Sequence, residues 1–235
     1  MTEIATDELL YEIRGTTGWV TLNRPQARNA LTYAMYEGLA GICASVPEYV
    51  SVKAIVVIGA GEKAFAAGTD MRQFRDFSKP QDAIDYEHRM SRVLDAIETC
   101  PVPMIAAIAG ACTGGGAAIA GVCDIRIATA DLKYGFPIAR TLGNTLAIEN
   151  LARLSALIGP GRVKDLIFTS RLVGAEEASA IGLISEIVPD HAALIERVTA
   201  LSETLAGQAP LTMRTIKEAL RRLRVDGPAA HDEDT

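Results

Sequence analysis

Two glycine-rich stretches lie where main-chain N–H groups could hold a negatively charged oxygen. Residues 113–116 read TGGG and stand where the spacing of small residues predicts the start of a helix. Residues 59–70 read GAGEKAFAAGTD and follow an apolar run. A helix start exposes N–H groups without partners inside the helix, and the helix dipole adds positive charge there. If N–H groups from both stretches converge, they form an oxyanion hole.

Two nucleotide-binding motifs with a similar glycine content do not fit these stretches. A dinucleotide fingerprint needs a third glycine, but Gly61 is followed by Glu62, Lys63 and Ala64. A phosphate loop needs Lys and Ser or Thr, but Gly116 and Ala117 follow Gly115. Glycines that only permit close packing of a helix on a strand are the alternative to anion binding.

The apolar spacing along the chain predicts the elements that must position these loops. Short apolar runs bounded by turn residues predict strands at 9–15, 18–24, 52–60, 103–110, 123–129 and 186–189. Helical spacing predicts helices after Thr32, a plausible N-cap, and at 80–99, 148–159, 161–170, 175–182, 192–207 and 211–223. This order predicts an α/β fold with a helical C-terminal part.

Composition narrows the class of protein. The chain has 235 residues, 49% hydrophobic and 22% charged, with a net charge of −6. These values are typical of a globular enzyme and argue against nucleic acid as the main partner. No apolar run reaches the ~18 residues of a membrane span, and the N-terminus has no apolar signal core. Four irregularly spaced cysteines and three histidines disfavour a metal site. We expect a cytoplasmic protein with reduced thiols.

Several motifs appear in one order over most of the chain. They are VTLNRPQARNAL (20–31), AFAAGTDM (64–71), the IAGACTGGG–CD block (108–124), LG (142–143) and GRVKDLIFTSRLVGAEEASAIGLISEIVP (161–189). Together they resemble the enoyl-CoA hydratase/isomerase, or crotonase, superfamily. The resemblance implies a spiral of ββα units over residues 1–190. It also implies a helical trimerisation region over 191–235, shorter than is usual in the family, in a homotrimer or a dimer of trimers.

The same resemblance implies a substrate and its contacts. The substrate is an acyl-CoA thioester, so coenzyme A enters with the substrate and no covalently bound cofactor is expected. By position, the two oxyanion N–H groups belong to Thr69 and Gly115. Residues on the loops that contact coenzyme A are Ala27, Arg28, Ala66, Asp70 and Met71. Arg28 could equally be a solvated surface residue.

The positions at which the family's hydratases carry two glutamates hold other residues here. The resemblance places those positions at Ala118 and Ile138, and neither side chain can transfer a proton. A positioned acid or base is worth about 10²–10⁴ in rate, so we expect little ordinary hydratase activity. The oxyanion hole is main chain and would be retained. Double-bond isomerisation, or decarboxylation of a malonyl-type thioester, needs at most one protein base.

The segment 138–154 is where a substitute group would be expected. Glu149 is the candidate base, although an acid in the first turn of a helix also stabilises the helix. Asn144 and Arg140 are further candidates, with a turn residue and a surface ion pair as their alternatives. We interpret His88 as structural or solvated. A non-catalytic acyl-CoA-binding protein that kept the fold is the competing hypothesis.

Overall fold

The computed structural model describes residues 6–46, 51–75, 78–141 and 145–227. Its larger sheet has six strands in the order β1-β2-β3-β5-β7-β9. They are β1 (Leu9–Arg14), β2 (Thr17–Leu22), β3 (Ala54–Gly59), β5 (Met104–Ile108), β7 (Ile125–Thr129) and β9 (Glu186–Val188). β1 and β2 form an antiparallel hairpin, and every later pair is parallel.

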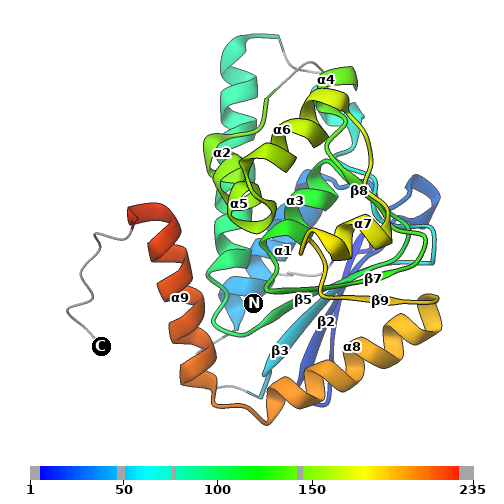
Figure 1. Cartoon of the computed structure of the whole chain (residues 1–235), viewed down its shortest axis with the longest axis vertical. Helices are drawn as coiled ribbons and strands as arrows, with labels where there is room; N and C mark the ends of the chain where they lie inside the picture. The colour runs from blue at the N-terminus through cyan, green and yellow to red at the C-terminus, as the bar shows by residue number, and fades with distance from the viewer. Residues whose placement is uncertain (1–5, 47–50, 76–77, 142–144, 228–235) are drawn as a thin grey trace.

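A second, smaller sheet has the parallel order β4-β6-β8. Its strands are β4 (Ala64–Ala66), β6 (Ala111–Thr113) and β8 (Lys133–Gly135). Each follows a strand of the larger sheet and precedes a helix, so the chain repeats a ββα unit, as predicted (Figure 1). The glycine- and alanine-rich composition of residues 61–74 predicts a loop, and this prediction was wrong in part, because the segment contains β4 and the 3₁₀ turn η2 (Met71–Phe74). Three-residue strands are too short to show an alternating pattern.

The helices predicted from the apolar spacing are present in the structure. Thr32 caps α1 (Tyr33–Ser45) by accepting from the N–H of Met35, as expected. The other helices are η1 (Pro25–Ala27), α2 (Pro80–Glu98), α3 (Gly115–Val122), α4 (Ile138–Thr141), α5 (Ile148–Ile158), α6 (Pro160–Thr169), α7 (Ala175–Ala180), α8 (His191–Ala206) and α9 (Pro210–Asp226). Figure 1 shows α1, α2, α3, α5, α6 and α7 on one side of the larger sheet and α8 on the other.

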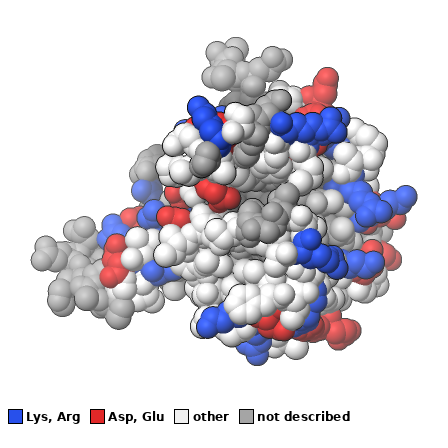
Figure 2. All heavy atoms as spheres, turned by 90° about the horizontal axis from the view of Figure 1, so that it is seen from above, with Lys and Arg blue, Asp and Glu red and all other residues white. Residues whose placement is uncertain are grey.

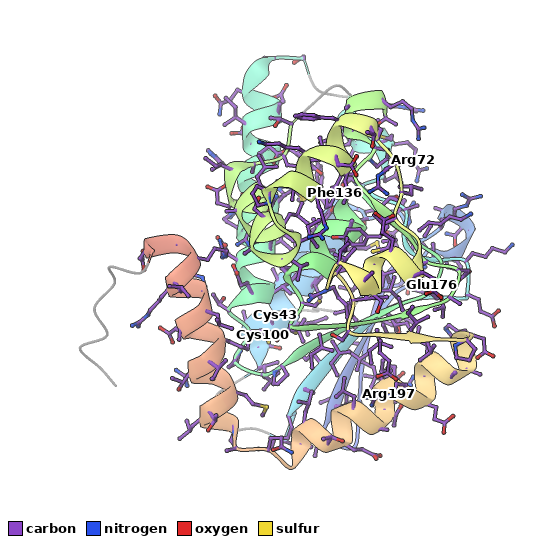
Figure 3. All side chains as sticks on the ribbon, viewed as in Figure 1. Cys43, Arg72, Cys100, Phe136, Glu176 and Arg197 are labelled. Atoms are coloured by element: carbon purple, nitrogen blue, oxygen red, sulfur yellow. The ribbon has the colours of Figure 1, made fainter. Side chains whose placement is uncertain are left out.

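The larger sheet is buried on both faces, which explains the continuous apolar runs. In β3, Ile55 and Val57 join the core under α1 to α3, whereas Val56 and Ile58 join the core under α8. The thiols of Cys43 and Cys100 lie in hydrogen-bonding contact in the first core (Figure 3). All four cysteines are buried and unpaired.

The two C-terminal helices differ in their packing. α8 contributes Leu194 and Val198 to the core beneath the sheet. α9 lies at the edge of the molecule (Figure 1), joined to the body by the ion pairs Lys217–Asp124 at 2.6 Å and Arg224–Glu98 at 2.5 Å. The division into 1–190 and 191–235 stays a prediction.

The helices and the surface bear on the environment and the partners of the molecule. Within the described residues, no helix has the length and apolar character needed to cross a bilayer. Figure 2 shows Lys and Arg interspersed with Asp and Glu over the face that it draws. A cytoplasmic location and the exclusion of nucleic acid stay predictions.

Candidate active site

The start of α3 is built by three glycines, each for a different reason. Gly114 has φ 53° and ψ −118°, a backbone conformation that side chains disfavour. A Cβ on Gly115 would lie 2.0 Å from the hydroxyl oxygen of Tyr36. A Cβ on Gly116 would lie 2.4 Å from the carbonyl oxygen of Ala66, at the end of β4. The TGGG stretch is therefore a tightly packed junction rather than a flexible loop.

The other half of the site follows β4. The N–H of Leu31 donates to the carbonyl of Gly68 at 2.8 Å, and the N–H of Asp70 donates to the carbonyl of Leu31 at 2.9 Å. These two bonds hold the main chain on either side of Thr69 and leave the N–H of Thr69 itself unused. Asp70 then caps η2 by accepting from the N–H of Arg72 at 3.0 Å.

The two predicted donors are brought together by the smaller sheet. β4 and β6 are parallel neighbours, so the segments that follow them leave at the same edge. The first helical bond of α3 runs from Ala118 to the carbonyl of Gly114, which leaves the N–H of Gly115 outside the helix ladder. Among the described residues, neither the N–H of Thr69 nor that of Gly115 has an acceptor. Both residues line one cavity.

That cavity has a volume of about 320 Å³ and is mainly apolar. Ala118 and Ile138 both line it, beside Gly115 and Thr69. Glu149 does not line it and lies exposed in the first turn of α5, so its role as a base stays a prediction. Arg140 is exposed as well. Asn144 lies outside the described residues, and His88 is exposed on α2.

A chain of three hydroxyl groups lies beside the two donors. Oγ1 of Thr69 is 2.9 Å from the hydroxyl of Tyr36 and 2.9 Å from the hydroxyl of Tyr86. Burial raises the pKa of Tyr36 well above its usual range and raises the pKa of Tyr86 to about 12. Both tyrosines are therefore neutral at physiological pH. Their hydroxyls fix the position of the Thr69 hydroxyl.

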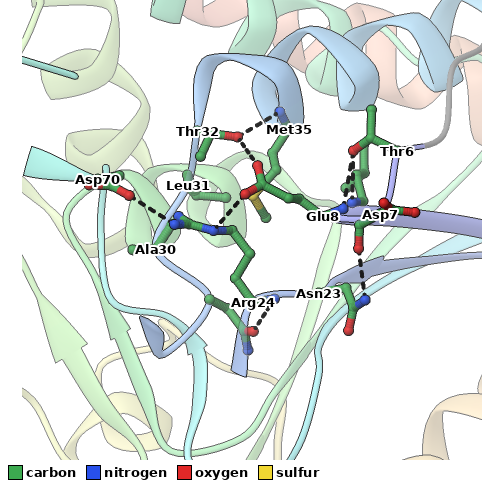
Figure 4. Close-up of polar contacts among 12 residues, drawn as sticks. Thr6, Asp7, Glu8, Asn23, Arg24, Ala30, Leu31, Thr32, Met35 and Asp70 are labelled. Carbon is green, nitrogen blue, oxygen red and sulfur yellow. Dashed lines mark hydrogen bonds and ion pairs between the residues drawn. The ribbon is translucent and has the colours of Figure 1, made fainter. Parts of the chain in front are cut away.

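A groove of about 530 Å³ adjoins the cavity, and Ala67, Thr69 and Met71 line both. Arg24 lies under this groove, 5% exposed, with ion pairs to Glu8 at 3.0 Å and to Asp70 at 2.9 Å (Figure 4). Hydrogen bonds from Arg72 and Arg24 hold the pKa of Asp70 well below its usual range. The groove is thus built around a fixed Arg–Asp–Arg arrangement.

The predicted coenzyme A contacts divide into two sets. Ala27, Asp70 and Met71 line the groove. The side chain of Asp70 already accepts hydrogen bonds from two arginines. Arg28 and Ala66 do not line the groove. Ala66 is buried beneath Gly116. Arg28 is exposed, and its main-chain carbonyl accepts a hydrogen bond from the N–H of Ala67 at 3.0 Å.

Four residues that sequence reasoning did not select lie in or beside the site: Tyr36, Tyr86, Glu87 and Arg24. Tyr86 and Glu87 belong to a helical stripe with Met90 and Leu94, all of which line the cavity. The sequence shows the helical spacing of these residues, but it does not show that they face this cavity. Nothing in the sequence marks Tyr36 as different from other core residues of α1.

Comparison with known proteins places this chain in a family. The chain belongs to the enoyl-CoA hydratase/isomerase family, whose model matches residues 12–230. It is 32% identical over 216 residues to a short-chain-enoyl-CoA hydratase of Clostridium acetobutylicum, covering 92% of this chain and 82% of that protein. It is 31% identical over 216 residues to a crotonyl-CoA hydratase of Syntrophomonas wolfei, with the same coverage of 92% and 82%.

Solved structures have the same fold. An enoyl-CoA hydratase/carnithine racemase from Magnetospirillum magneticum matches with a TM-score of 0.89 at 34% identity, over 97% of this chain and 85% of that one. DspI of Pseudomonas aeruginosa matches with a TM-score of 0.86 at 31% identity, over 95% of this chain and 84% of that one. The family resemblance and the α/β spiral are therefore confirmed.

Proposed function

We propose that this protein binds an acyl-CoA thioester and stabilises its enolate with the N–H groups of Thr69 and Gly115. The observation that carries the proposal is this pair of unused main-chain donors lining one apolar cavity. Negative charge develops on the thioester oxygen as the enolate forms, and fixed donors favour that state over the neutral carbonyl. Arg72, whose side chain is 64% exposed, lines the adjoining groove, and its guanidinium supports binding of a coenzyme A phosphate there.

The reaction that we favour is double-bond isomerisation, with decarboxylation of a malonyl-type thioester as the second candidate. Hydration needs both a base for water and an acid for carbon. The resemblance places the two hydratase glutamates at Ala118 and Ile138, and both line the cavity with apolar side chains. The two relatives described above are called hydratases, so hydration is the first reaction to measure.

One assay separates these activities. The protein is incubated with crotonyl-CoA, a 3-enoyl-CoA or methylmalonyl-CoA, and the thioesters are separated by liquid chromatography, which resolves the isomers of equal mass, and identified by mass spectrometry. Conversion of the 3-enoyl thioester without rapid hydration of crotonyl-CoA is the expected result. Fast hydration would contradict the role given to Ala118 and Ile138. Clear binding without turnover would favour a non-catalytic acyl-CoA-binding protein, and failure to bind any thioester would overturn the proposal.

We further infer self-association of the chain, as the expected trimer or dimer of trimers, through α9. Large apolar side chains of this helix are exposed: Leu211, Ile216, Leu220, Leu223 and Val225. Ile216, Leu220 and Leu223 share one helix face by their spacing. An exposed apolar stripe of this kind supports a contact with another copy of the chain.

A further inference from the structure

The cavity contains one carboxylate, Glu87, that takes no part in the oxyanion site. Among the described residues that line the cavity, Glu87 is the sole Asp or Glu. It lies on the face of α2 that also presents Tyr86, Met90 and Leu94 to the cavity. Partial burial of a carboxylate on an otherwise apolar stripe costs free energy, because the charged group loses water. Such a residue in a cavity is a candidate for a role in binding or catalysis.

The surroundings of Glu87 connect it to the predicted oxyanion donors. Its charge acts on the hydroxyls of Tyr36 and Tyr86, adding to the effect of burial on the pKa of both. Those two hydroxyls are the ones that contact Oγ1 of Thr69. Glu87 therefore lines the same cavity as Thr69 and Gly115, next to the Tyr86 hydroxyl that contacts Thr69.

The carboxylate also has a structural partner. The N–H of Ala147, the N-cap residue of α5, hydrogen-bonds to Glu87, and Ala147 has no capping side chain of its own. A carboxylate has two oxygens with about four lone-pair positions, so one oxygen can accept from Ala147 while the other faces the cavity. This contact accounts for the orientation of Glu87 without using up its capacity for proton transfer.

We propose that Glu87 is the group that transfers the proton in this site, which rests on the function proposed above. The carboxylate takes a proton from C2 of a 3-enoyl thioester, and the electron pair of that C–H bond delocalises onto the thioester oxygen at Thr69 and Gly115. The dienolate then takes the same proton back at C4. The double bond moves from C3–C4 to C2–C3, and no other reactant is consumed.

Glu87→Gln tests this assignment, because the amide keeps an acceptor for Ala147 but cannot take a proton. Isomerisation of a 3-enoyl-CoA is measured by chromatographic separation of the two isomers, which have equal mass, and exchange of the C2 proton of butyryl-CoA in D₂O is measured by mass spectrometry. Loss of both by about 10²–10⁴-fold is expected. Binding of butyryl-CoA, measured by calorimetry, and the thermal midpoint should match the wild type. Asp85→Asn removes an exposed carboxylate two residues away and serves as the matched control.

The outcomes distinguish this proposal from the one on which it rests. Retention of exchange and isomerisation in Glu87→Gln would overturn the assignment, as would loss confined to Glu149→Gln. A wild-type protein that binds butyryl-CoA but exchanges no C2 proton has no proton-transferring group, so Glu87 would be a positioning residue for α5 only. A wild-type protein that binds no thioester would overturn both proposals, and calorimetry alone would reveal it.

Discussion

The hydroxyl of Tyr36 occupies the space that a side chain at Gly115 would need. A Cβ there would lie 2.0 Å from this oxygen, 3.0 Å from Oγ1 of Thr69 and 3.3 Å from Cδ1 of Leu31. The first distance is far below any real contact, whereas the other two require only small shifts. One atom of α1 therefore requires glycine at the start of α3.

Gly115→Ala should lower turnover of the acyl-CoA substrate by about 10²–10³-fold, the value of one oxyanion donor. The new methyl group must displace either the Tyr36 hydroxyl or the start of α3, and both movements disturb the N–H of residue 115. Adding Tyr36→Phe removes the atom that clashes and should restore part of kcat/KM. Gly161→Ala is the control, because nothing lies within 4 Å of its added Cβ. No recovery in the double variant would contradict this explanation.

Thr69→Val should destabilise the fold while leaving the main-chain donor in place. Two tyrosine hydroxyls would each lose one hydrogen-bond partner, and one such hydrogen bond is worth about 0.5–1.5 kcal/mol. Urea unfolding measures the change. In a double-mutant cycle with Tyr36→Phe, the combined loss should be smaller than the sum of the single losses. Additive losses would mean that the hydroxyls do not act as one network.

Asp70→Asn should lower stability at neutral pH, and the difference from the wild type should shrink in acid. The pKa of Asp70 is lower in the folded protein, chiefly because of Arg72 and also because of Arg24, so the stabilisation is present above the unfolded value of about 4. It is lost as pH falls from there towards the folded value. Urea midpoints between neutral pH and pH ~3 check this course. A difference independent of pH would argue against an ionic origin.

The pH profile of isomerisation should report Glu87. Burial raises the pKa of its carboxyl, the N–H of Ala147 opposes the shift, and the charge of Glu149 adds to it. Since proton abstraction needs the carboxylate, the rate should rise with pH through a value above the ordinary range of glutamate. Tyr36 and Tyr86 also face this group but remain neutral over that range. Glu149→Gln should move the rising limb to lower pH, and an unmoved limb would contradict the assignment.

Leu220→Lys should weaken self-association of the chain. Leu220 is 62% exposed in the middle of the α9 stripe, so a charge there would be buried in any contact that uses this face. Light scattering after size-exclusion chromatography gives the mass of the wild type and the variant. Thr215→Lys adds the same charge at an exposed position on another side of the helix. An equal effect of both substitutions would point to charge rather than to the apolar stripe.

The main-chain part of the site was predictable because it depends on local rules. Glycines at a helix start and at the end of a strand indicated the donor positions at Thr69 and Gly115 once the family resemblance gave the register. Glu87 and Tyr36 were not predictable, since their roles depend on how α1 and α2 pack across the cavity. A charged residue on an amphipathic helix has the same sequence pattern whether it faces water or a cavity. The strands of the smaller sheet were missed because three residues carry no periodic pattern.

The proposed donors at Thr69 and Gly115 limit which substitutions the protein can tolerate and how it could become resistant to an inhibitor. Both proposed donors are main-chain groups, so substitutions of the other cavity residues can change the reaction while these two N–H groups stay in place. A substitution that weakens an oxyanion mimic bound to these two N–H groups, such as Gly115→Ala, would also lower turnover of the proposed substrate. Gly114, Gly115 and Gly116 tolerate few substitutions. A larger residue is disfavoured by the backbone conformation at Gly114, by the Tyr36 hydroxyl at Gly115 and by the Ala66 carbonyl at Gly116.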